Sequence, residues 1–291
     1  MKLRKTLTVL AFVLISLPLT ACTKVGLFTL NNTIAFNPHF TRHKNLSYGK
    51  EPLQQLDVYT PKDSKGPNPV VVFFYGGSWQ SGSKNEYKFM GEALTSLGYT
   101  VVIPNYRVYP EVKFPTFVED AAKAVRWTND NIQTYGGDVA QIYVMGHSAG
   151  AHIAALLSYD KKYLRAENLN VNSVIRGFIG LAGPYDFLPF TSDVFKTIFG
   201  PEEKFALSQP INFISGTEPR SLLLYGKKDK TVWPQNIVNL SQKINSHKGQ
   251  VQTIYYDDLN HVSIITKFSR LLRRNYLLND VRDFILNAPK N

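Results

Sequence analysis

The sequence predicts an α/β fold with a mostly parallel central sheet, helices on both faces and a small cap. Short apolar runs rich in β-branched and aromatic residues recur along the chain, as at 70–74 and 100–104. Such runs are typical of strands that are buried on both faces. Longer segments with helical periodicity lie between them, for example at 117–135. Strands that alternate with helices favour a parallel sheet covered on both sides.

Glycine and proline indicate where the expected elements begin and end. Gly98 ends a helix expected over 86–97, a pair of glycines ends the long helix over 117–135, and the stretch 61–69, with proline at each end, is expected to be a loop. The expected strands are 54–59, 70–74, 100–104, 141–145, 174–181, 221–226 and 251–256, and the further expected helices are 151–157, 234–247 and 267–286.

The length and composition fit one large domain. The chain has 291 residues, of which 44% are hydrophobic and 19% are charged, enough to bury a sizeable core. We place this domain at 46–291, with a small cap inserted at about 184–219, a stretch rich in aromatic and turn residues. The cap's phenylalanines either line an acyl or aryl pocket or form the cap's own core: Phe187, Phe190, Phe195 and Phe199.

The pentapeptide 146–150 has the sequence GHSAG, which fits the pattern G-x-S-x-G. An expected strand precedes it and an expected helix follows it. In that context the serine lies on a sharp, strained turn and acts as a nucleophile, and the glycines avoid clashes with the adjoining strand and helix. Ser148 is therefore the candidate nucleophile. The alternative is a chance match in a glycine-rich turn.

A nucleophile of this kind needs an acid and a histidine later in the chain. Asp229 and His261 each follow an apolar strand, and catalytic groups gather where the strands of such sheets end. The ordinary pKa of histidine, near 6.5, suits His261 to act as general base at neutral pH. Asp229 would hold His261 in the required tautomer and stabilise its imidazolium form. Asp257 and Asp258 are rival acids, but the acid usually comes from a different loop than the base.

A glycine-rich loop at 75–79 follows the expected strand over 70–74. Its glycines let the backbone approach a substrate, so that the amides of Gly77 and Ser78 can point at a developing oxyanion. The amide of Ala149, which follows the nucleophile, would be a further donor. The alternative is an ordinary β-turn.

These motifs resemble the α/β-hydrolase superfamily, and more narrowly its esterase branch with an HGG-type oxyanion loop and a GHSAGAH elbow. That branch includes hormone-sensitive-lipase-like carboxylesterases, prenylcysteine methylesterase-like proteins and kynurenine-formamidase-like proteins. The matching pieces are 76–79, 105–107, 146–152, 183–186, Asp229 and His261. The resemblance implies that Ser148 attacks an ester or amide carbonyl and that water resolves the acyl-enzyme, with no metal or organic cofactor.

One residue departs from the pattern of this branch. Tyr75 stands where the branch has a structural histidine. Its hydroxyl is expected to hold the loop in place, but the substrate of any one subfamily does not carry over. His147 and His152, on either side of the elbow, are expected to be packed or hydrogen-bonded and not catalytic.

Together these observations favour a serine carboxylesterase acting on a small-molecule ester with a short acyl or aryl group. The first alternative is an arylformamidase or amidase with the same triad. The second is a non-catalytic binding protein of the same fold. Proteins of that kind typically lose the serine, the histidine or the oxyanion glycines, all of which are present here.

Residues 1–21 resemble a bacterial lipoprotein signal peptide. A basic segment at 1–5 precedes an apolar segment at 7–20. The apolar segment is shorter than a typical transmembrane helix, and Pro18 interrupts it. The segment ends in the sequence LTAC, which resembles a lipoprotein cleavage box. The alternative is an ordinary signal peptide cut at a nearby alanine.

Cys22, the single cysteine of the chain, would carry the lipid and be followed by an arm or tether over 22–45. We therefore expect an exported lipoprotein of the bacterial cell envelope that is anchored to a membrane and does not span it. Thr23 follows in place of aspartate, which favours the outer membrane where a cell has two.

The formal net charge is +11. Removing the signal segment leaves 30 basic against 22 acidic residues, or +8. Such a surface either lies close to anionic headgroups or is simply basic and soluble. Nucleic-acid binding is not expected, because the basic residues are scattered and no recognition motif is present.

Overall fold

The computed structural model describes residues 29–31, 39–64 and 66–287. Its centre is an eight-stranded sheet with the strand order β1-β2-β4-β3-β5-β6-β7-β8. The strands are β1 (Phe40–Ser47), β2 (Gln55–Pro61), β3 (Asn68–Phe74), β4 (Thr100–Pro104), β5 (Gly137–His147), β6 (Ile175–Leu181), β7 (Arg220–Gly226) and β8 (Val251–Tyr256).

Seven of these strands run in one direction, and β2 runs opposite to them, pairing antiparallel with both β1 and β4. Each parallel connection crosses over through helical segments, as such connections require. The predicted fold class, a mostly parallel α/β sheet of the α/β-hydrolase type, is therefore confirmed. The register pairs Phe74 with Gly146, so the loops that follow β3 and β5 leave the sheet side by side.

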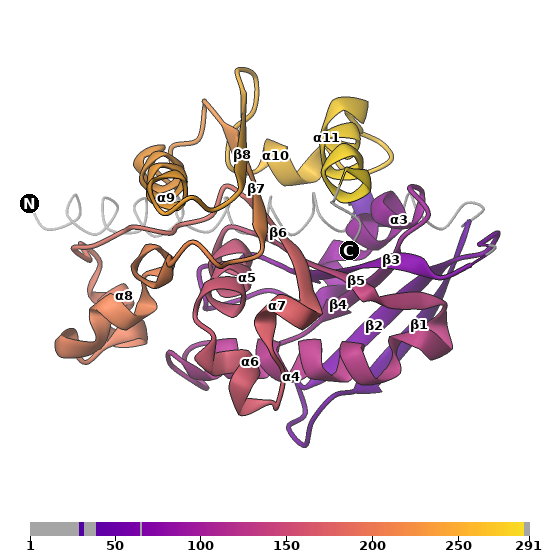
Figure 1. Ribbon diagram of the computed structural model, residues 1–291, viewed down its shortest axis with the longest axis horizontal. Helices are drawn as coiled ribbons and strands as arrows, with labels where there is room; N and C mark the ends of the chain where they lie inside the picture. The colour runs from indigo at the N-terminus through magenta and orange to yellow at the C-terminus, as the bar shows by residue number, and fades with distance from the viewer. Residues whose placement is uncertain (1–28, 32–38, 65, 288–291) are drawn as a thin grey trace, which may run out of the picture.

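Helices cover both faces of the sheet (Figure 1). The α-helices of 8 to 16 residues are α3 (Lys88–Thr95), α4 (Thr116–Asn131), α5 (Ala149–Tyr159), α9 (Gln235–Ser246) and α11 (Asn275–Leu286), and the shorter ones are α6 (Lys162–Ala166), α7 (Val171–Val174), α8 (Asp193–Phe199) and α10 (Ser263–Thr266). The 3₁₀ helices are η2 (Lys84–Tyr87), η3 (Ile132–Tyr135), η4 (Glu202–Ser208) and η5 (Pro210–Phe213). In Figure 1, α3 and α11 lie on one side of the sheet, and α4 and α5 lie on the other.

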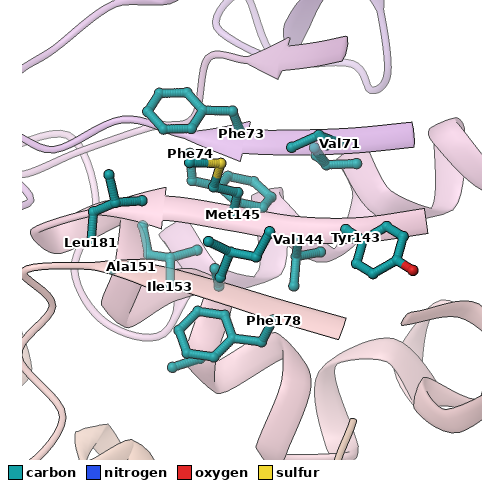
Figure 2. Packing of buried hydrophobic residues seen from close by; sticks show 14 of the residues in the cluster. Val71, Phe73, Phe74, Tyr143, Val144, Met145, Ala151, Ile153, Phe178 and Leu181 are labelled. Carbon is teal, nitrogen blue, oxygen red and sulfur yellow. The ribbon is translucent and has the colours of Figure 1, made fainter. Parts of the chain in front are cut away.

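The core lies between the central strands and the helices. Figure 2 shows Val71, Phe73 and Met145 from β3 and β5 beside Ala151 and Ile153 from α5, and all five side chains are fully buried. Full burial of an aliphatic or aromatic side chain contributes about 1.5–3 kcal/mol. This packing fixes α5 against β5, and therefore fixes the turn between them.

The segment expected to form the cap lies between β6 and β7. It carries α8, η4 and η5, and α8 projects to one side of the sheet in Figure 1. Buried aromatic rings hold it together: the Phe190 and Phe199 rings stack with their centres 5.1 Å apart, and Phe205 meets Phe190 edge-on at 4.7 Å.

Two expected boundaries were wrong. The arm expected over 22–45 includes the start of a strand, because β1 begins at Phe40 and pairs with β2. The helix expected over 267–286 begins only at Asn275. Before it, the Arg273 guanidinium pairs with Glu92 of α3 and donates to the Phe268 carbonyl, which holds the preceding residues in turns.

The expected signal peptide at 1–21 and the lipid site at Cys22 lie outside the described residues. Within the described ranges, none of the helices is both long and apolar enough to cross a membrane.

Candidate active site

Ser148 lies on a sharp turn between β5 and α5. Its φ of 54° and ψ of −123° fall in a region that non-glycine residues seldom occupy. The turn is possible because its neighbours are glycines. A Cβ on Gly146 would come within 2.3 Å of the Gly150 backbone, and one on Gly150 within 2.1 Å of the Phe74 carbonyl oxygen. The GHSAG pattern therefore marks a partly buried serine on a crowded turn.

The structure brings Ser148, His261 and Asp229 into one hydrogen-bonded line. The Ser148 hydroxyl donates to Nε2 of His261 at 2.9 Å. Nδ1 of His261 donates to Oδ2 of Asp229 at 2.7 Å. The three residues follow different strands, β5, β8 and β7, so the convergence comes from the sheet and not from sequence proximity. This is the geometry in which a histidine can take the serine proton while a carboxylate fixes its tautomer.

The Asp229 carboxylate is buried and well supplied with donors. Its other oxygen accepts the amides of Thr231 at 2.7 Å and Val232 at 3.0 Å. Burial acts to raise the pKa of Asp229, but hydrogen bonds from His261 and these amides outweigh it, and the pKa is lowered. The carboxylate therefore stays ionised at neutral pH, as a partner for an imidazolium requires.

The rival acids lie elsewhere. Asp257 is exposed and pairs with Lys227 at 2.7 Å, and Asp258 accepts a long hydrogen bond from the Tyr276 hydroxyl at 3.4 Å. In the part of the chain that the structure describes, neither forms a hydrogen bond or an ion pair with the His261 side chain.

The glycine-rich loop after β3 packs against the turn that carries Ser148. Gly77 has a φ of 141°, and Ser78 and Trp79 have φ values of 53° and 59°. A Cβ on Gly77 would lie 2.0 Å from the Ser81 carbonyl oxygen, so the loop needs glycine there. Among the described residues, the amides of Gly77 and Ser78 donate to no backbone or side-chain acceptor. Free amides in a strained loop beside a nucleophile can receive a negative oxygen.

Tyr75 buttresses this loop by stacking. Its ring lies between those of Tyr106, at 4.6 Å, and Tyr87, at 5.6 Å. Its hydroxyl donates to Oδ1 of Asn105 at 3.3 Å, and the Tyr106 hydroxyl donates to its carbonyl at 2.6 Å. Burial raises the pKa of the Tyr75 hydroxyl, so the group remains neutral. The tyrosine thus fixes the loop through its ring and through both its polar groups.

The two histidines near the elbow are buried and uncharged. Nε2 of His147 donates to the His261 carbonyl at 2.8 Å, which steadies the backbone of the base. Nδ1 of His152 accepts from the Trp79 indole at 3.2 Å, and its Nε2 donates to the Ser208 carbonyl at 2.7 Å. Burial lowers the pKa of His147 to about 3 and that of His152 to about 4. Through its hydrogen bonds with Trp79 and Ser208, His152 joins the glycine-rich loop to the cap.

A cavity of about 450 Å³ opens over Ser148. Aromatic side chains from the loop and the cap form one wall, namely Trp79, Phe187, Phe190 and Phe195, and the exposed Trp233 stands at another side. Phe199 does not line the cavity. Its ring is fully buried and meets that of Trp79 edge-on at 4.8 Å. The cap phenylalanines therefore divide between the two roles expected for them.

The cavity also has a polar wall, formed by residues of α9 and the cap, and no motif of the sequence indicated it. The Asn239 amide donates to Asp186 at 2.6 Å, and the Gln235 amide donates to the Asn239 carbonyl oxygen at 2.7 Å. Asn236 accepts the backbone amides of Tyr185 and Asp186. The spacing of the α9 residues, four apart, is a helical period, but only the fold places them over Ser148. No group of three or more histidine, cysteine or acidic residues in the described ranges could hold a metal ion.

Comparison with known proteins identifies the family of this chain. The BD-FAE family model matches residues 56–244. The chain belongs to the BD-FAE family. An isoprenylcysteine alpha-carbonyl methylesterase of Arabidopsis thaliana is 26% identical over 280 residues, covering 89% of this chain and 65% of the relative. A kynurenine formamidase of Danio rerio is 29% identical over 241 residues, covering 80% of this chain and 78% of the relative.

Solved structures share the fold. An esterase B from Lactobacillus rhamnosis superposes with a TM-score of 0.78 at 20% identity, covering 95% of this chain and 96% of that one. A truncated carbohydrate esterase from gut microbiota gives a TM-score of 0.74 at 22% identity, covering 87% and 98%. The BD-FAE chain described here spans 52–65% of the length of three methylesterase relatives from Arabidopsis thaliana.

Proposed function

We propose that this chain is a serine carboxylesterase that hydrolyses small esters through Ser148, His261 and Asp229. The observation that carries the proposal is the unbroken hydrogen-bonded line from the Ser148 hydroxyl through His261 to Asp229. The names of the related methylesterases and esterases support the same reaction class.

In the first half of the reaction, Ser148 Oγ attacks the ester carbonyl carbon while His261 Nε2 takes the hydroxyl proton. The carbonyl oxygen becomes an oxyanion, which the amides of Gly77, Ser78 and Ala149 receive. The bond to the alcohol oxygen then breaks, and His261 returns the proton to that oxygen. The products of this half are a free alcohol and an ester of Ser148 with the acyl group.

In the second half, water attacks the acyl-enzyme and His261 again takes the proton. The acid leaves and the proton returns to Ser148. No step needs an oxidant, a reductant or a metal ion. Each amide of the oxyanion site would contribute about 3–4 kcal/mol to transition-state stabilisation.

The cavity supports a short acyl or an aryl group as the substrate. Its volume of about 450 Å³ is at the small end of the range for ligand sites. Its aromatic wall favours a flat or short apolar group. The polar wall built on Asp186 and Asn239 favours a substrate that also carries hydrogen-bonding groups.

The second candidate is an arylformamidase or amidase that uses the same triad. It rests on the kynurenine formamidase relative of Danio rerio, most of whose length this chain covers. The two functions differ only in the bond that Ser148 attacks.

The test is hydrolysis of 4-nitrophenyl esters from acetate to palmitate, and of an N-formylaniline, by the wild type and the Ser148→Ala variant. The matched control is Ser241→Ala, which replaces a serine of α9 that is far from Ser148 in the sequence. We expect the highest kcat/KM with a short acyl group, and a loss of at least about 10³-fold in Ser148→Ala alone. A higher rate on the formamide would select the second candidate. Equal ester rates in the wild type and Ser148→Ala would contradict both.

A further inference from the structure

A second cavity, of about 360 Å³, lies at the edge of the sheet opposite the triad. It is formed where β6 and β7 begin, together with the residues just before β8. The triad residues follow the C-terminal ends of their strands, and these parallel strands run in one direction. The two cavities therefore lie at opposite ends of the parallel strands.

Positive charge dominates this cavity. Arg176, Arg220 and Lys248 line it, and its one carboxylate is that of Glu218. That carboxylate is already engaged, because its two oxygens accept the Gly216 amide at 3.1 and 2.9 Å. Among the described residues, neither Arg220 nor Lys248 forms an ion pair.

Arg220 is held in a fixed orientation with a donor left unused. Its guanidinium carbon lies 4.1 Å from the centre of the Phe284 ring, a cation–π contact. Gly177 makes room for that ring, since a Cβ there would lie 3.0 Å from it. The Nη1 group of Arg220 is buried and has no hydrogen-bond partner within the described ranges. A buried donor of a charged group is costly to leave unsatisfied.

The surroundings also disfavour two neighbouring cations. Burial lowers the pKa of the Arg220 guanidinium, and the positive charge of Arg176 lowers it further. An anion bound in the cavity would offset the repulsion between the charges of Arg176 and Arg220. It would also accept a hydrogen bond from Nη1 of Arg220.

We propose that this cavity binds a phosphate group through Arg220, Arg176 and Lys248. Guanidinium groups recognise phosphate oxygens with two parallel hydrogen bonds, and an ammonium adds a mobile point charge. Three cations from three segments suit an anion that carries several oxygens and more than one charge. The phosphate comes either from solution or from the headgroup of an anionic lipid. This site does not depend on the proposed esterase activity.

The test is the thermal unfolding midpoint, Tm, of the full chain as inorganic phosphate is added at constant ionic strength. The variants are Arg220→Gln and Lys248→Gln, and Lys243→Gln, an exposed lysine of α9 outside the cavity, is the matched control. We expect a saturable rise of about 2–3 °C at ten times the dissociation constant in the wild type and in Lys243→Gln. Each cavity variant should weaken binding at least tenfold. A wild type whose Tm does not respond to phosphate, or variants that respond as it does, would overturn the proposal.

Two further arms complete the test. If Arg220→Gln does not fold by circular dichroism, the exposed Lys248 still provides the comparison, and an unchanged dissociation constant in Lys248→Gln would then overturn the proposal. Monomeric dihexanoyl phosphatidylglycerol replaces phosphate in a parallel titration. Tighter, Arg220-dependent binding of the lipid would assign the site to headgroups, and tighter binding of inorganic phosphate would assign it to the free anion.

Discussion

Ser148, His261 and Asp229 contact one another although 113 residues separate the serine from the base. Their chain order and the strands before them were enough to predict that these three residues lie together, because the parallel strands β5, β7 and β8 end at the same edge of the sheet. The choice between Asp229 and the acids next to His261 followed from the same rule. The structure adds what spacing cannot give, namely that His261 and two backbone amides together hold the Asp229 carboxylate ionised.

The assignment of the acid is tested by comparing three carboxylates. Asp229→Asn should lower kcat by about 10³–10⁴-fold, because an amide cannot stabilise the imidazolium or fix the same tautomer. Asp257→Asn, at an exposed residue paired with Lys227, and Asp258→Asn are matched controls and should change kcat less than about twofold. Steady-state hydrolysis of a 4-nitrophenyl ester measures all three. Equal losses at Asp229 and Asp258 would refute the assignment.

His152 makes folding stability depend on pH. Burial lowers its folded-state pKa to about 4, below the unfolded value near 6.5. The unfolded chain therefore binds the proton more readily, and stability falls as the pH drops from about 6.5 toward 4. At pH 5 this residue should account for about 2 kcal/mol of lost stability relative to pH 7.

Urea unfolding at pH 7 and pH 5 checks this expectation. The decrease in unfolding free energy between the two pH values should be smaller by about 2 kcal/mol in His152→Gln than in the wild type. The exposed His247, replaced in the same way, is the matched control. If the unfolding free energy decreased equally in His152→Gln and the wild type, His152 would not be an uncharged, buried histidine.

Among the connections between elements, the turn between β5 and α5 is tightly constrained, because a Cβ on Gly146 or Gly150 would clash with backbone atoms. Its pattern could be predicted because glycine is needed wherever backbones approach this closely. Other features could not be predicted, since they depend on partners far away in the chain. The turns before Asn275 are held by Glu92, 181 residues from Arg273, and the polar wall of the cavity joins the cap residue Asp186 to α9.

Gly150→Ala tests this constraint against ordinary helix propensity. Alanine usually stabilises a helix by about 1 kcal/mol relative to glycine, but here its Cβ would lie 2.1 Å from the Phe74 carbonyl oxygen. We expect a destabilisation of about 1–3 kcal/mol in urea unfolding, with a lower kcat. Gly66→Ala, where no atom lies within 4 Å of the added Cβ, should be near neutral. Greater stability in Gly150→Ala would contradict the close approach.

For the whole molecule, we propose that the domain is exported and held at a membrane of the bacterial cell envelope by a lipid on Cys22. This proposal rests on the sequence, because residues 1–28 lie outside the described ranges. It would place a basic domain, with a charge of +8 after the signal segment, beside anionic headgroups. Attraction to such a surface amounts to about 1 kcal/mol for each nearby lysine or arginine.

Cys22→Ser in a bacterial host tests the anchor. The wild-type chain should sediment with membranes, and the variant should lose the lipid mass and remain in the soluble envelope fraction, since no other anchor is expected. Fractionation followed by mass spectrometry of the N-terminal peptide measures both. Membrane sedimentation that is unchanged in Cys22→Ser, with no lipid on the wild type, would exclude the lipoprotein interpretation.

If Ser148 forms a covalent intermediate, it should also react with a fluorophosphonate, and peptide mass spectrometry locates the adduct. We expect one adduct, on Ser148, with displacement of fluoride. Labelling should be lost in Ser148→Ala and slowed by several orders of magnitude in His261→Gln, which lacks the base. A wild-type protein that stays folded and unlabelled, or an adduct on another residue such as Ser78, would show that Ser148 is not the nucleophile.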